Sequence, residues 1–188
     1  MEASTSCNPQ DTVGIYFPRA TPYLTHLTAH DHICGLARTS EDKFVFFGGD
    51  VAHHPGEYRP TPHLPLPAEI KPSPFEGPRS ASVCAGAIFE NFHRAKEAGG
   101  DYRTTPFYEV NPAANISVPE AQASTDKMEV FDASPDVFVI IAHDTSVLDI
   151  VPLFPKTING WDATDNKTLS TWRFLKDFET AAKSNKTE

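Results

Sequence analysis

The stretch that decides the fold runs from an apolar segment straight into two glycines, an acid and two histidines: Phe44-Val45-Phe46-Phe47-Gly48-Gly49-Asp50-Val51-Ala52-His53-His54. A short, unbroken run of aromatic and β-branched residues is typical of a strand buried on both faces. The two glycines then allow a tight turn, or the close approach of another chain or a ligand. Asp50 stands where the strand ends, and in layered α/β folds such ends are where sites are built. Taken alone, the pattern fits a buried strand with a capping aspartate better than a site.

A second segment shows the same pattern and makes a functional site the better interpretation. Val137–Ile141 is again apolar and β-branched, and it ends in Ala142-His143-Asp144. Two buried strands that end in Asp50 and His143 can bring both side chains to one rim of a sheet. A carboxylate and an imidazole are ordinary ligands of zinc or iron. The two segments together therefore favour a metal site at Asp50 and His143 over two residues that only cap strands.

Composition limits the class of protein. The chain has 188 residues, 39% hydrophobic and 22% charged, which is typical of one globular domain with a real core. The net charge of −9 argues against nucleic acid or an anionic membrane as a partner. Three scattered cysteines form neither a disulfide framework nor a cysteine zinc motif. No leader and no apolar run of membrane-spanning length is recognisable, so we expect a cytoplasmic protein.

The expected organisation is an irregular segment at 1–22, one α/β (α+β) domain over 23–182 and a frayed tail at 183–188. Strands at 33–37 and 44–47 are close enough to form a hairpin. Hydrophobic spacing predicts helices over 80–98, 119–131 and 171–182, and a short helix-like segment over 146–154. The proline-rich segment 55–78 is either a wall or lid of a substrate pocket, or a surface connector.

Histidines cluster before the first strand. His26, His30 and His32 fall within seven positions, and Asp31 lies between the last two. In an extended segment His30 and His32 share one face, which makes the cluster capable of binding metal. A polar turn, or histidines hydrogen-bonded within the core, explains the same residues equally well.

Three motifs in this order carry a family resemblance: Ala29–Arg38, Phe46–His54 and Val139–Asp144. Together they resemble the C-terminal half of a fungal-type metallo-β-lactamase superfamily protein, over residues 23 to 178. The resemblance implies a partial αββα sandwich, a mixed sheet flanked by helices. It also implies two metal ions, usually zinc, at the rim between two sheets. Members of the family hydrolyse lactams, lactones and thioesters. By this resemblance Asp50 is the bridging aspartate and His143 is the last metal-binding histidine.

The sequence departs from the family pattern at its other ligands. The family's His-x-His-x-Asp-His loop is absent, Thr28 stands where a ligand histidine is expected, and Leu27 replaces a glycine. His26 or His30 would have to substitute for the histidine missing at Thr28. Since a zinc site normally needs three protein ligands, we expect weak metal binding from Asp50 and His143 alone.

These observations lead to one main expectation and two alternatives. The main one is a truncated metal-dependent hydrolase that acts on a small lactam, lactone or thioester in secondary metabolism or xenobiotic degradation. Its partners would be a small-molecule substrate and a missing N-terminal half, with neither nucleic acid nor membrane. The first alternative is a non-catalytic remnant or binding module. The second is an unrelated α/β protein whose motifs match by chance.

Overall fold

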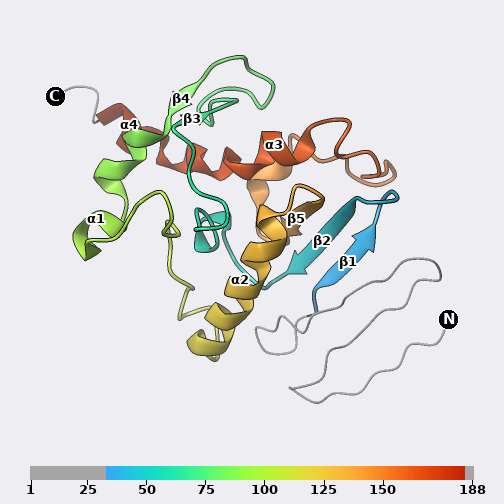
Figure 1. Cartoon of the computed structure of the whole chain (residues 1–188), viewed down its shortest axis with the longest axis horizontal. Coiled ribbons are helices and arrows are strands. Elements are labelled where there is room, and N and C mark those ends of the chain that lie inside the picture. The colour runs from blue at the N-terminus through green and yellow to red at the C-terminus, as the bar shows by residue number, and fades with distance from the viewer. Residues whose placement is uncertain (1–32, 185–188) are drawn as a thin grey trace.

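The computed structural model describes residues 33–184, and Figure 1 shows a small sheet with a long helix across it. The sheet has the order β1-β2-β5, with β1 at Gly35–Arg38, β2 at Phe44–Gly49 and β5 at Val137–Ile141. β1 and β2 are antiparallel, which confirms the predicted hairpin, while β2 and β5 are parallel. Helices flank this mixed sheet, so the predicted α/β class is confirmed. The expected segment 1–22 lies outside the described residues.

One face of the sheet is covered by α2 (Val118–Ala133), close to the predicted helix at 119–131. A parallel neighbour cannot be reached by a tight turn, so the chain leaves β2 and returns through α2 to β5. The ring of Phe46 stacks on Phe131 at 5.0 Å between centroids, and Met128 is fully buried beside them. α2 therefore holds the two parallel strands in one layer.

The opposite face is covered less completely. Val45 and Phe138 are buried there against Trp161, whose Nε1 donates to Thr39 Oγ1 at 3.1 Å. Phe47, on the same face and nearer the end of β2, is 45% exposed. Burial on both faces is therefore confirmed for Val45 and its neighbour Phe46, but the prediction is wrong at Phe47.

The predicted helix over 80–98 is wrong. The chain instead forms β4 (Cys84–Ala85), the 3-10 helix η2 (Gly86–Phe92) and the short helix α1 (Ala95–Ala98). β4 pairs with β3 (Glu69–Ile70), and Gly86 N donates to Ala68 O at 2.8 Å. The pairing of β4 with β3 takes the place of the first turns of the helix that the hydrophobic spacing predicts. Gly99 ends α1 in a left-handed conformation, as the predicted stop requires.

The C-terminal part is also more broken than predicted. It contains α3 (Asn166–Thr171), η4 (Arg173–Phe178) and α4 (Glu179–Ser184) instead of one helix over 171–182. The expected helix-like segment at 146–154 is only the single turn η3 (Thr145–Val147). Leu175 is buried as predicted. It belongs to a second core that joins η4 to the β3–β4 region through Leu66, Ile70, Cys84, Phe89, Phe107 and Phe174.

The start of the proline-rich segment is part of the core. Residues 55–61 are all buried, and they include the 3-10 helix η1 (Pro55–Glu57). A surface connector is therefore the wrong interpretation for this part of the segment. Within residues 33–184, no helix combines the length and apolar character that crossing a membrane requires.

Candidate metal centre

The structure brings together the two residues that the sequence singled out. The Nε2 atom of His143 lies 2.9 Å from Oδ1 of Asp50. Their side chains are 49% and 35% exposed, respectively, so the pair lies at the surface, at the end of the parallel strands. The pair can offer one carboxylate and one imidazole to a ligand that approaches from solvent.

The two glycines before Asp50 are needed for this geometry. A Cβ atom at Gly48 would lie 2.9 Å from Cγ2 of Ile141, so β2 can approach β5 only without a side chain there. Gly49 has a φ of 53°, a left-handed conformation that glycine adopts without strain. Its carbonyl accepts a hydrogen bond from Ala142 N at 2.9 Å, one residue before His143. The Gly-Gly pair thus sets the distance between Asp50 and His143.

Cys34 is buried next to this turn. Its Sγ donates a hydrogen bond to Gly48 O at 3.3 Å. Burial raises the pKa of the Cys34 thiol to about 12. Cys34 therefore supports the strand end through its hydrogen bond to Gly48.

Two polar residues next to the pair, Asp144 and His54, cap short helices. Asp144 is buried, and its Oδ1 accepts hydrogen bonds from the backbone and the hydroxyl of Ser146, which caps η3. His54 Nδ1 accepts from Gly56 N at 2.9 Å and caps η1, while its Nε2 lies 3.1 Å from Asp177 Oδ2. Neither residue faces the pair.

His53, in contrast, lies against the pair, and sequence reasoning missed it. Its ring stacks on that of His143, with 5.0 Å between centroids and 26° between planes. The two adjacent histidines were visible in the sequence, but no local signal tells which of them faces the strand end.

The donor set of Asp50 and His143 fits part of a metal site. A zinc site normally uses three or four protein ligands. Among residues 33–184, no group of three His, Cys, Asp or Glu side chains is placed to hold a metal ion. The candidate ligands His26, His30 and His32, with Thr28, lie outside the described residues.

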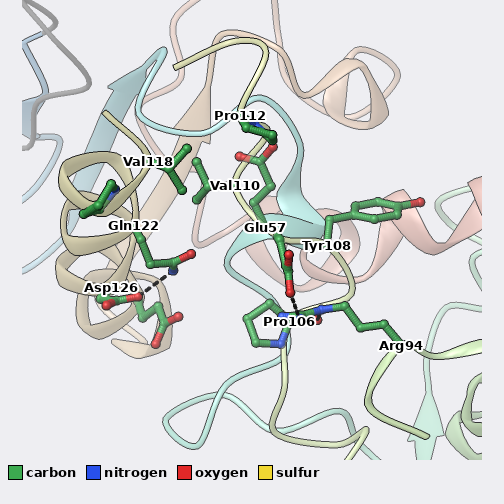
Figure 2. Close-up of a pocket in the computed structure, with 12 residues that line it drawn as sticks. Glu57, Arg94, Pro106, Tyr108, Val110, Pro112, Val118, Gln122 and Asp126 are labelled. Atoms are coloured by element: carbon green, nitrogen blue, oxygen red, sulfur yellow. Dashed lines mark hydrogen bonds and ion pairs between the residues drawn. The ribbon is translucent and has the colours of Figure 1, made fainter. Parts of the chain in front are cut away.

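A cavity of about 490 Å³ adjoins the segment that follows Asp50 (Figure 2). It lies between α2 and residues 106–112, and Glu57 lines it, so the start of segment 55–78 forms a cavity wall. Gln122 Nε2 donates to Asp126 Oδ1 at 2.7 Å on the helix side. Thr125 on the same helix donates to Val51 O at 3.3 Å, which ties this wall to the turn after Asp50.

Comparisons with known proteins bear on this site. The chain is similar to the metallo-hydrolase mfmC of Annulohypoxylon moriforme, with 39% identity over 171 residues, which cover 87% of this chain and 42% of the relative. It is similar to the gamma-lactamase FDB1 of Fusarium pseudograminearum, with 35% identity over 162 residues, which cover 83% of this chain and 38% of the relative. The chain belongs to the metallo-β-lactamase superfamily.

The match covers only part of the length of these relatives. The chain spans about two fifths of the length of both relatives (42% and 38%). It also matches a protein named cytochrome P450 monooxygenase mpaDE' of Penicillium brevicompactum, 32% identical over 175 residues. That match covers 91% of this chain but 18% of the relative, so most of that protein lies outside it. No protein-family model and no solved structure matches the chain.

Proposed function

We propose that this chain forms part of a metal-dependent hydrolase that acts on a small lactam, lactone or thioester. The observation that carries the proposal is the 2.9 Å contact between Asp50 Oδ1 and His143 Nε2 at the ends of two parallel strands. Two relatives are by name a metallo-hydrolase and a gamma-lactamase, which supports hydrolysis and favours a cyclic amide among the three substrates. Secondary metabolism or xenobiotic degradation in the cytoplasm is the setting that we propose for this activity.

In this proposal Asp50 and His143 hold the metal, and zinc is the ion that suits their ligand types. When bound, such an ion polarises a substrate carbonyl and lowers the pKa of water. Asp50 contributes a negative charge and His143 a neutral nitrogen. Both side chains are partly exposed, so a small substrate can reach them from solvent.

The rest of the ligand set is proposed to come from outside residues 33–184. His26 or His30 of this chain is one source, and a separate N-terminal half is the other. The two sources differ in what the purified chain does by itself. Ligands within residues 1–32 would give metal binding by the 188-residue chain alone, whereas a separate half would have to be added.

The test is hydrolysis of a panel of five-membered lactams, lactones and thioesters. The full chain is assayed alone and together with the N-terminal part of a curated relative. We expect turnover that a chelator abolishes and zinc restores, and that is lost in Asp50→Asn and in His143→Ala. His63→Ala is the matched control, because His63 is exposed and lies outside the pair. No turnover and no metal binding under either condition would support a non-catalytic binding module instead.

A further inference from the structure

The imidazole rings of His53 and His143 lie against each other beside Asp50. Their ring planes are only 26° apart, with centroids separated by 5.0 Å. A ring that lies against His143 restricts the rotation of the His143 imidazole. The contact can therefore orient His143.

The backbone of His53 is held by a buried carboxylate. His53 N donates to Oε2 of Glu57 at 3.0 Å, and Glu57 is 4% exposed. The turn between these residues is itself fixed, because Gly56 O accepts from Tyr108 N at 2.9 Å. A Cβ at Gly56 would lie 2.8 Å from Cδ2 of Tyr108, so the two segments are in close contact. His53 is thus presented to His143 from a rigid turn.

His143 needs such support more than a buried ligand does. Its side chain is 49% exposed and stands beyond the end of β5, where packing constrains its rotamer weakly. A stacked ring contact favours one orientation of the His143 ring over the others. Residues that orient metal ligands through hydrogen bonds typically affect metal affinity about 10- to 100-fold, and a ring contact acts on the same ligand orientation.

We propose that His53 is a positioning residue that holds the His143 imidazole toward Asp50, and that Glu57 fixes His53 for this purpose. The importance of this contact for metal binding rests on the proposed function. The orientation of His143 is a separate question, because the ring contact involves only side chains of this chain. The two are therefore tested by separate measurements.

The first measurement is NMR of the histidine ring signals in the metal-free full chain. A ring stacked on His143 shifts its proton resonances upfield. We expect His53→Ala to move the His143 signals toward those of an unstacked histidine, while His53→Phe, which keeps a flat ring, retains the upfield shift. We expect Glu57→Ala to act like His53→Ala, and Glu57→Gln to act like the wild type because its amide oxygen still accepts the His53 N–H. Unchanged His143 signals in His53→Ala, with the fold intact by circular dichroism, would overturn the proposal.

The second measurement is zinc affinity of the same variants, by competition with a chromophoric chelator. We expect His53→Ala to weaken binding about 10-fold and His53→Phe to stay within about threefold of the wild type. Loss of binding in both His53 variants, as complete as in Asp50→Asn, would make His53 a ligand and overturn its positioning role. If the wild type binds no zinc either alone or with the added N-terminal part of a relative, the proposed function fails, and the NMR comparison still decides the role of His53.

Discussion

Asp50 Oδ1 lies 2.9 Å from His143 Nε2, and the two residues stand just beyond neighbouring parallel strands. The contact is made by the packing of β2 against β5, since the two residues are far apart in the chain. Gly48 sets that packing, because its missing side chain leaves room for Ile141. Changes that push the strands apart should separate the two candidate ligands even when both side chains are kept.

Gly48→Ala tests this packing. The added Cβ would lie 2.9 Å from Ile141 Cγ2 and 3.0 Å from Val51 Cγ1, so the strands must shift. We expect a loss of about 1–3 kcal/mol in the free energy of unfolding, measured by urea denaturation. Gly35→Ala is the control, because nothing lies within 4 Å of a Cβ there. Equal effects of the two substitutions would argue against close approach at Gly48.

A buried ion pair links the core to α2 and α3. Arg59 Nε donates to Asp132 Oδ2 at 2.7 Å, both side chains are at most 3% exposed, and Arg59 Nη1 also donates to Thr171 O at 2.9 Å. Asp132→Ala leaves a buried, unpaired guanidinium. We therefore expect a loss of about 3–5 kcal/mol in the free energy of unfolding, measured by urea denaturation.

The control for this pair is Glu109→Gln, which removes the charge of a carboxylate that is 80% exposed and paired with Arg94. Exposed pairs contribute little, so we expect a change of less than about 1 kcal/mol. A loss in Asp132→Ala as small as this would contradict the structural importance of the Arg59 pair.

Glu129 should make stability depend on pH. Burial, with the nearby charges of Asp126 and Asp132, raises the pKa of the Glu129 carboxyl to about 7. The folded state therefore holds this proton more tightly than the unfolded state, and stability falls as pH rises from about 4.5 to 7. Glu129→Gln removes that loss. We expect it to be more stable than the wild type by roughly 1–2 kcal/mol at pH 8 and equal to it near pH 4.

The measurement for Glu129→Gln is urea denaturation at pH 4 and pH 8. Glu97→Gln is the control, because Glu97 is an exposed carboxylate on α1. An identical pH dependence in the wild type and Glu129→Gln would show that the carboxyl titrates normally.

The strand ends were predictable because their signals are local. An apolar β-branched run followed by Gly-Gly-Asp, and a second followed by Ala-His, predict two buried strands, and parallel pairing then places Asp50 beside His143. The observed structure over 80–98 was not predictable. Gly86 pairs with Ala68, which is distant in the sequence, and the helical spacing does not reveal this contact.

His53 and His54 show the same limit within the site. They are adjacent and chemically identical, yet one stacks on His143 and the other caps η1 beside Asp177. The two side chains have different roles because their tertiary contacts differ, and a local sequence pattern does not predict tertiary contacts.

The most direct measurement is anomalous X-ray scattering at the zinc edge from crystals of the full chain soaked in zinc. We predict a peak within about 2.0–2.2 Å of both Asp50 Oδ1 and His143 Nε2, and no peak there in Asp50→Asn crystals. Zinc that binds elsewhere, or no peak between these two atoms in crystals both of the chain alone and of its complex with the N-terminal part of a relative, would contradict a metal centre at this end of the sheet.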